Sequence, residues 1–422
     1  MIKFIQLIIL TAAASLTLSA NQARPNVILI ISDDHAYYDY GFMGSERVHT
    51  PVIDKLANES LTYTRGYTMP VCSPTLASLL TGKLPHQHGI TGNDLAKKSK
   101  QWGAGERKLL AEKLLSNSLL LPKALSESGY LTFQTGKLWN GTYKEMGFTH
   151  GMTSKGSRHG DKGLSIGRDG MEPIFDFIEK ARKAEKPFFI WHAPFLPHTP
   201  HNPPARLHNK YKGKGPTAAA EKYFAMVEWL DESTGELENY LQENHLTENT
   251  VIIYIADNGW NPEKGTRGGR YKMSPYEGGI RTPIFVRWPG KVNPEMDETT
   301  LAHVTDVTKT IVDLTKAEDP GDLPGLNLLD RQAMQKRDTV FVEAYTHDIA
   351  DLSAPGKSLF ASVVIDGWWK LLIPTEIEPK LSFATKPEGL ELYNLQTDPY
   401  EKKNVAKQHP EVVARLKQLQ KE

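Results

Sequence analysis

Cysteine is almost absent from this sequence, because its 422 residues contain a single one, Cys72. One cysteine cannot form an internal disulfide, so the stability of the fold has to come from its core and from any bound metal. A lone cysteine is usually a small buried apolar residue. That interpretation stays open beside a chemical role for the thiol.

Net charge is also absent, because 50 basic residues balance 50 acidic ones. A neutral chain offers no bulk electrostatic attraction to nucleic acid or to an anionic membrane, so neither is an expected partner. Beyond the first residues, no stretch has eighteen apolar residues in a row. A transmembrane span is therefore not expected in the rest of the chain.

The first 23 residues have the pattern of a secretory signal peptide. A lysine precedes an apolar run over residues 4–18, and small residues lead to Ala20 and Ala23, after either of which cleavage is expected. An uncleaved membrane anchor is the alternative. The pattern predicts a periplasmic or secreted protein that is free of the membrane after cleavage.

Apolar runs alternate with amphipathic stretches over residues 26–288, which is typical of a mostly parallel sheet flanked by helices. The expected strands are residues 26–32, 130–135, 187–193, 250–256 and 283–288. The expected helices are residues 51–60, 118–129, 172–184 and 219–244, the last with an apolar stripe that Gly235 interrupts. The fold class is therefore α/β.

Residues 319–332 are rich in proline, glycine and aspartate and predict a domain boundary. After it come short strand-like stretches and a closing helix at residues 410–420. We expect an α/β domain over residues 24–329 and a small antiparallel sheet with one helix over residues 330–422.

Two expected strands run directly into oxygen-rich pairs, Asp33-Asp34 and Asp257-Asn258. Ligands collect at the carboxyl ends of strands in α/β sheets, and adjacent carboxylates repel unless a cation neutralises them. Three carboxylates and a carboxamide form a set that suits Ca²⁺, with Mg²⁺ the second choice. The alternative is that each pair caps a helix or a turn.

Cys72 lies at an expected helix start. Ser73 can cap a helix and Pro74 suits its first position, so the backbone N–H groups nearby would favour an anion.

Two lysines and a histidine complete a possible site. Lys137 follows the strand at 130–135, His198 lies in PHTP beyond the strand at 187–193, and Lys272 lies in a glycine-rich stretch. Alone, each would be an ordinary solvated or loop residue. Together with a metal and a nucleophile they supply what hydrolysis of a tetrahedral oxyanion ester needs.

Several stretches resemble the formylglycine-dependent, or type I, sulfatases of the alkaline phosphatase superfamily. They include RPNVILIISDDHAYYDYG, YTMPVCSPTLASLLTGKLPHQHGITGN, GYLTFQTGKLW, APFLPHTP, ADNG, KMSPYEGGIRTPIFVRWPG and LELYNLQTDPYEKKNVA. The resemblance extends from about residue 24 to residue 406. It implies an alkaline-phosphatase-like fold with a small C-terminal sheet domain.

The resemblance also implies a role for each site residue. The calcium ligands match Asp33, Asp34, Asp257 and Asn258. The position oxidised to formylglycine matches Cys72, and its hydrated aldehyde supplies an oxygen nucleophile that also contacts the metal. The sulfate-holding lysines match Lys137 and Lys272, and the histidine near the leaving group matches His198. A formylglycine-generating maturation enzyme is then an expected partner.

Two positions depart from the family pattern. The motif Cys-x-Pro-x-Arg has Leu76 in place of arginine, and Lys-x-His has Trp139 in place of histidine. In the family both missing residues support the formylglycine, and the arginine also helps the maturation enzyme to recognise its substrate. Arg267 and Arg270 are the nearest candidates to compensate.

The sequence thus predicts an exported sulfatase that hydrolyses sulfate esters of a small molecule or a polysaccharide. The aromatic loop HAYYDYGF favours a carbohydrate, although ordinary packing explains it equally well. One alternative is a phosphoester hydrolase of the same superfamily, since fold does not decide function. The other is a non-catalytic protein that binds sulfated glycan, which the changes at Leu76 and Trp139 would suit.

Overall fold

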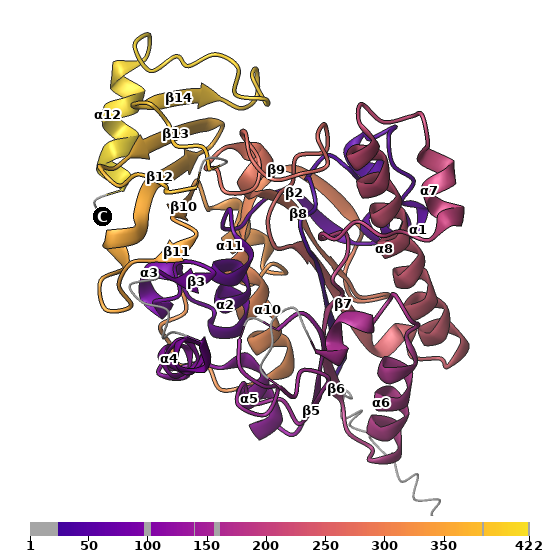
Figure 1. Ribbon diagram of the computed structural model, residues 1–422. Coiled ribbons are helices and arrows are strands. Elements are labelled where there is room, and N and C mark those ends of the chain that lie inside the picture. Colours follow the sequence, from indigo (N-terminus) through magenta and orange to yellow (C-terminus); the bar gives the residue numbers. More distant parts are fainter. Residues whose placement is uncertain (1–23, 97–102, 139, 156–160, 382–383, 421–422) are drawn as a thin grey trace, which may run out of the picture.

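The computed structural model describes residues 24–96, 103–138, 140–155, 161–381 and 384–420. The predicted signal peptide, residues 1–23, lies outside the described residues, and so does Trp139. Two sheets organise the described chain, one of eight strands and one of four (Figure 1). None of the helices described is long and apolar enough to cross a membrane.

The eight-stranded sheet has the order β5-β4-β6-β1-β7-β8-β2-β9. Its strands are β1 (Asn26–Ser32), β2 (Leu61–Tyr67), β4 (Leu131–Gly136), β5 (His150–Gly151), β6 (Phe188–Ala193), β7 (Thr250–Ala256), β8 (Arg281–Arg287) and β9 (Glu295–His303). Neighbouring strands are parallel except at β8, which runs antiparallel to β7 and β2. The predicted mostly parallel sheet is confirmed.

Helices cover both faces of this sheet. In β1, Val27, Leu29 and Ile31 belong to the core shared with one set of helices: α2 (Cys72–Thr81), α5 (Leu121–Glu127) and α10 (Val304–Thr315). Ile28 and Ile30 belong to the core shared with the other set: α1 (Pro51–Asn58), α6 (Glu172–Lys183) and α8 (Ala218–Glu243). Because side chains alternate along a strand, one buried strand serves both layers, which lie on opposite sides of the sheet in Figure 1.

Shorter helices lie in the connections: α3 (Pro85–His88), α4 (Gly103–Leu115), α7 (Ala205–Tyr211), α9 (Glu277–Ile280) and α11 (Arg331–Gln335). The glycine that interrupts the stripe of α8 has a packing reason. A Cβ on Gly235 would lie 3.1 Å from Val52 Cγ2, so glycine lets α1 approach α8 closely.

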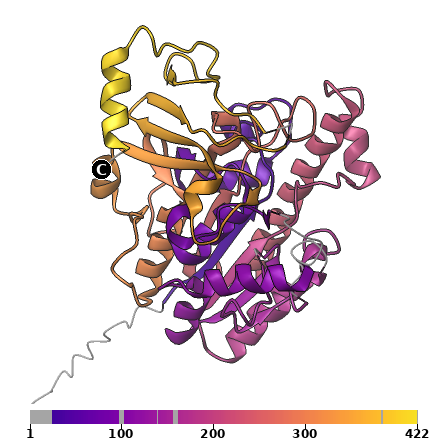
Figure 2. The ribbon, with the colours of Figure 1, turned by 60° about the vertical axis from the view of Figure 1, so that its left-hand side comes forward.

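The C-terminal part is an antiparallel sheet with one helix. Its strands β10 (Thr339–Tyr345), β12 (Leu359–Asp366), β13 (Trp369–Pro374) and β14 (Glu391–Asn394) pair in that order. Helix α12 (Pro410–Leu419) covers one face (Figure 2), where Leu416 packs in a cluster with Val364, Leu371 and Leu392. Val340, Val342 and Val363 join the main core. The predicted fold class is confirmed, and the domain boundary at residue 330 stays a prediction.

A two-stranded parallel sheet links the two parts of the molecule. Strand β3 (Asp94–Leu95) pairs with β11 (Asp348–Ile349), so the chain shortly after α2 lies against the chain shortly after β10.

Candidate active site

The predicted site residues follow four strands that are neighbours in the sheet. Strands β4, β6, β1 and β7 are adjacent and parallel, and Ser32 at the end of β1 lies level with Ala256 at the end of β7. Their carboxyl ends therefore present Lys137, His198, Asp33-Asp34 and Asp257-Asn258 at one edge. Lys272 reaches the same place from the chain before α9.

Lys137 is paired with Asp33. Its Nζ lies 2.9 Å and 2.8 Å from the two carboxylate oxygens of Asp33, and 3.6 Å from Asp257 Oδ2. Burial acts to raise the pKa of Asp33, but the charges of Lys137, His198 and Lys272 together outweigh it and the net shift of this pKa is downward. Burial acts to lower the pKa of Lys137, yet the negative charges around it, with Asp33 the strongest, together hold this pKa above its usual value. Both groups are charged at neutral pH.

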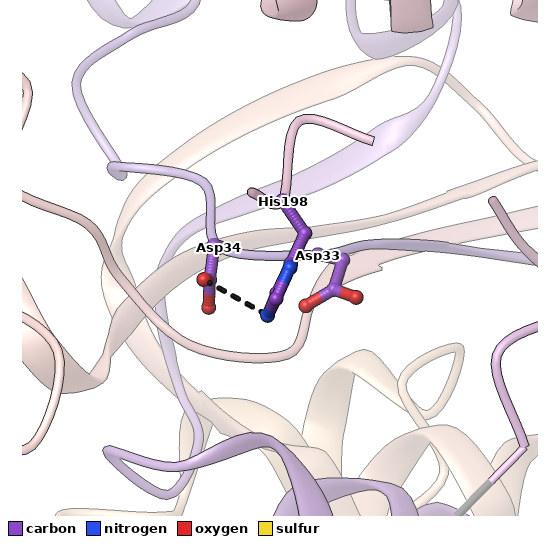
Figure 3. Close-up of side chains that lie close together, drawn as sticks. All are labelled: Asp33, Asp34 and His198. Carbon is purple, nitrogen blue, oxygen red and sulfur yellow. Dashed lines mark ion pairs between the residues drawn. The ribbon is translucent and has the colours of Figure 1, made fainter. Parts of the chain in front are cut away.

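Asp34 is the most heavily contacted carboxylate of the site. Its Oδ1 accepts hydrogen bonds from Lys272 Nζ and, at 2.7 Å, from Asn258 Nδ2. His198 Nε2 lies 3.5 Å from its Oδ2, the contact drawn in Figure 3. Asp34 has a φ of 61°, a left-handed conformation uncommon for aspartate, and its backbone N–H donates to Asp257 Oδ1 at 3.0 Å. Such a conformation persists where its surroundings fix it, as they do here.

Three buried oxygen atoms in this cluster have no hydrogen-bond partner among the described residues: Asp34 Oδ2, Asp257 Oδ2 and Asn258 Oδ1. They come from the residues predicted to bind Ca²⁺. Burial, with the nearby charge of Asp33, raises the pKa of Asp257, which is the effect that a bound cation would reverse. Carboxylate and amide oxygens are the ligands of hard divalent cations, so these residues fit Ca²⁺ or Mg²⁺.

The formal charge of the cluster leads to the same conclusion. Three carboxylates outnumber the two lysine ammonium groups by one, so a divalent cation would leave one net positive charge. Ligand atoms of Asp33, Asp34 and His198 also lie within 4.8 Å of one another, a grouping that includes the histidine (Figure 3).

His198 is held by its backbone neighbour and by an aromatic ring. Its Nδ1 lies 2.5 Å from the carbonyl oxygen of Thr199, which can only accept a hydrogen bond, so Nδ1 carries a proton. The imidazole ring stacks on the ring of Phe195, with 4.2 Å between the ring centroids. Burial lowers the pKa of His198, although Asp33 and Asp34 oppose the shift. Nε2 therefore faces the carboxylates and is the ring nitrogen that can gain or lose a proton.

The expected capping of α2 is wrong. Helix α2 begins at Cys72, its N-cap is Val71 without a side-chain hydrogen bond, and Pro74 is the third helical residue. Thr75 Oγ1 instead accepts the backbone N–H of Met69 at 3.1 Å. A proline anywhere in the first turn costs no helix hydrogen bond, because those N–H groups have no partner within the helix. Cys72 thus lies at the helix start as predicted, and it is buried, with 1% of its surface exposed.

The two arginines considered as substitutes for the missing one, Arg267 and Arg270, are both on the exposed side of the loop before α9. Arg270 donates to the carbonyl of Glu401 and lies over the ring of Tyr276, on the side of the C-terminal sheet. Arg267 is exposed. Leu76 is 1% exposed and packs in the hydrophobic core that α2 shares with α5 and α10.

The structure adds residues that the sequence alone did not indicate. Asn93 lies 3.7 Å from Cys72 Sγ, and His347 lies 3.3 Å from Asn93. Arg168 donates to the carbonyl of Phe195 at 2.6 Å and to Asn202 Oδ1 at 2.5 Å, so it fixes the chain that carries His198. Asn93 ends the family-like stretch HGITGN, which was a usable signal, whereas nothing marks His347 or Arg168.

Comparison with known families agrees with this geometry. The sulfatase family model matches residues 25–317, and the model of the C-terminal region of N-sulphoglucosamine sulphohydrolase matches residues 268–422. This chain belongs to the sulfatase family. The predicted family is confirmed, and the enzyme is a sulfuric ester hydrolase.

Relatives of this sulfatase cover most of its length. It is 25% identical to an N-acetylgalactosamine-6-O-sulfatase of Bacteroides thetaiotaomicron, over 94% of this chain and 93% of the relative. It is 26% identical to an ulvan-active sulfatase of Formosa agariphila, over 92% of this chain and 77% of that relative. Among solved structures, the PsFucS1 sulfatase from Pseudoalteromonas sp. matches with a TM-score of 0.72 at 23% identity, over 94% of this chain and 89% of that one. That likeness supports the fold.

Proposed function

We propose that this sulfatase is an exported enzyme that releases sulfate from a sulfated carbohydrate, with a formylglycine made from Cys72 and a Ca²⁺ ion. The observation that carries the proposal is the group of three buried oxygens without hydrogen bonds, Asp34 Oδ2, Asp257 Oδ2 and Asn258 Oδ1. They lie at the strand ends beside Lys137, where Lys272 also reaches, and the negative charge of a Cys72 thiolate raises the pKa of both lysines.

Asp33, Asp34, Asp257 and Asn258 would hold the cation, with the side chain at position 72 beside it. When bound, the ion supplies Lewis-acid polarisation of an oxyanion. The hydrated aldehyde of formylglycine would supply the attacking oxygen. Lys137 and Lys272 would hold the sulfuryl oxygens and stabilise the charge that develops as the S–O bond to the sugar breaks.

In its imidazolium form, His198 would give its Nε2 proton to the departing alkoxide and return to the neutral imidazole protonated at Nδ1. Its Nδ1 is occupied by the Thr199 carbonyl, so only Nε2 is available for this transfer. Burial favours the neutral imidazole, and therefore favours release of the proton once the imidazolium has formed.

The charge of the centre favours sulfate over phosphate. With a divalent ion, the cluster has one net positive charge, which matches the single negative charge of a sulfate ester. A phosphate monoester carries almost two negative charges at neutral pH. We therefore expect faster turnover of an aryl sulfate than of the matching aryl phosphate.

A carbohydrate substrate is supported by the relatives and by a cavity lined by aromatic residues. The named relatives act on N-acetylgalactosamine sulfate and on ulvan. A cavity of about 800 Å³ is lined by Tyr37, Tyr38, Tyr271 and Tyr400 among others. Tyr37 and Tyr271 are close in the chain to Asp34 and Lys272, and aromatic faces of this kind suit sugars. Export is supported by the signal-peptide pattern of residues 1–23.

Mass spectrometry tests the proposal most directly. Protein purified from its native host should yield a tryptic peptide over residues 66–83 in which the thiol of Cys72 has become an aldehyde, and a mature N-terminus after residue 20 or 23. The same protein should release sulfate. An entirely unmodified thiol would overturn the formylglycine mechanism and favour a glycan-binding protein, and faster cleavage of aryl phosphate would overturn the sulfate preference.

A further inference from the structure

A chain of polar contacts joins Cys72 to the C-terminal part of the molecule. Cys72 Sγ lies 3.7 Å from both Oδ1 and Nδ2 of Asn93. Asn93 Oδ1 accepts the backbone N–H of Ser73 at 3.1 Å, and Asn93 Nδ2 lies 3.3 Å from His347 Nε2. The asparagine amide therefore lies between the start of α2 and an imidazole from the segment between β10 and β11.

The partner of His347 fixes which ring nitrogen donates. His347 Nδ1 lies 2.7 Å from Asp348 Oδ1, and Asp94 Oδ2 lies 3.9 Å from the same nitrogen. A carboxylate accepts hydrogen bonds, so Nδ1 carries a proton and Nε2 presents a lone pair to the Asn93 amide. The amide is thereby held with Nδ2 towards His347 and Oδ1 towards Ser73.

Backbone contacts also hold the segment of Asn93 against the segment of His347. The N–H of Asn93 donates to the carbonyl of His347 at 2.7 Å, next to the parallel pair of β3 and β11. A Cβ on Gly92 would lie 2.5 Å from that carbonyl oxygen, so only glycine permits this approach. The meeting of Asn93 and His347 is therefore built into the main chain.

We propose that Asn93 and His347 hold the side chain at position 72, in the absence of the arginine and histidine that Leu76 and Trp139 replace. This inference rests on the proposed function. Sγ marks where an oxygen of a hydrated formylglycine would lie, and an amide offers that oxygen both a donor and an acceptor. Asn93 contacts the nucleophile position, and His347 is a positioning residue that acts through Asn93.

The kinetic test uses three variants of His347 and one control. Loss of a residue that orients a ligating or reacting group typically costs about 10–100-fold, so His347→Ala should lower kcat by that factor with KM nearly unchanged. His347→Gln should recover most of the rate, because its amide oxygen reaches the place of Nε2. The shorter side chain of His347→Asn reaches only the place of Nδ1, so this variant should not recover the rate. His86→Ala is the control, because His86 pairs with Glu343 across the same two parts of the chain.

A second readout is independent of turnover. In protein made without a maturation system, the rate at which methyl methanethiosulfonate modifies Cys72 should rise several-fold in His347→Ala and Asn93→Ala, and stay near the wild-type rate in His347→Gln and His86→Ala. Melting temperatures check that each variant is folded.

The outcomes separate the two proposals. Unchanged thiol reactivity and unchanged kcat in His347→Ala would overturn the inference, and so would a loss that glutamine fails to rescue, since that indicates a packing role. Wild-type protein that releases no sulfate would overturn the proposed function. The rates of Cys72 modification would still test whether His347 acts on position 72 through Asn93.

Discussion

Two of the clusters of buried charge among the described residues differ in the balance of acids and bases. The strand-end cluster contains Asp33, Asp34, Lys137, Asp257 and Lys272. The interface cluster contains Glu277, Arg281, Lys370 and Glu401, where α9 and β8 meet the C-terminal part. Lys370 Nζ lies 2.9 Å from Glu277 and 2.8 Å from Glu401, and Arg281 lies 3.6 Å from Glu277.

The interface cluster has two acids and two bases, whereas the strand-end cluster has one acid in excess. Burial and ion pairing are common to both, so neither property marks a functional site. The excess negative charge and the grouping of three oxygens without hydrogen bonds do, whereas the interface cluster has one such atom, Glu401 Oε1, which lies 2.8 Å from Lys370 Nζ. The first cluster is therefore the one whose charge a bound cation would balance, and the charges of the second already balance within the chain.

The largest expected effect concerns His198, at the edge of the strand-end cluster. Replacing it with alanine removes the proposed proton donor, so kcat/KM for an alkyl sugar sulfate should fall about 10²–10⁴-fold. An activated aryl sulfate should lose much less, because a phenolate departs with little protonation. Both substrates are measured with the same variant. Equal losses would contradict the acid role and would assign His198 to binding.

The interface cluster is tested by Lys370→Met, which removes one charge and keeps the volume. Two buried carboxylates then lose their shared partner, so the free energy of unfolding should fall by about 3–5 kcal/mol. Urea unfolding measures this loss. The kcat of the folded fraction should stay near wild type, and a large fall in kcat would show that the two clusters are coupled.

The same substitution at Lys137 is the matched variant. Lys137→Met should lower kcat about 10²–10³-fold, because a charge that stabilises the transition state is lost. In saturating Ca²⁺ its unfolding free energy should stay closer to wild type than that of Lys370→Met, since the cation neutralises Asp33. If Lys137→Met loses as much unfolding free energy as Lys370→Met and keeps the same kcat, the two clusters do not differ in function.

Calcium gives the smallest expected effect. A ligand that binds only the folded state at 100 times its Kd stabilises it by about 2.7 kcal/mol, so Ca²⁺ should raise the melting temperature of chelator-stripped protein. Asp257→Asn should remove most of this rise, and Lys370→Met should retain it. An identical melting curve with and without Ca²⁺ would argue against the metal site.

The sequence predicted the central strands because their apolar runs are continuous, and it located the strand-end residues because they follow those runs. It did not indicate β2, whose sequence LTYTRGY is broken by polar residues. Arg65 in that strand is buried because its guanidinium donates to the carbonyls of Thr299 and Gly367 and lies over Trp368. Strand β9 is missed for a similar reason, since three acidic residues interrupt EMDETTLAH, and one of them, Asp297, is buried.

The site was only partly predictable for a topological reason. Asp33 and Asp257 meet because parallel strands end at one edge, which is a general rule. Asn93 and His347 meet because a two-residue strand pair joins segments 254 residues apart in sequence. No periodicity or turn signal marks so short a pairing.

The burial of Cys72 sets a schedule for biosynthesis. All ten residues of α2 are buried. The segment that contacts Asn93 leads into β11, and the first residue of β11, residue 348, follows residue 72 by 276 positions. A ribosome adding 5–20 residues per second needs roughly 14–55 s to cover that distance. A maturation enzyme that oxidised Cys72, as we propose, would have to act on the nascent or unfolded chain, because the folded molecule buries the thiol within a helix.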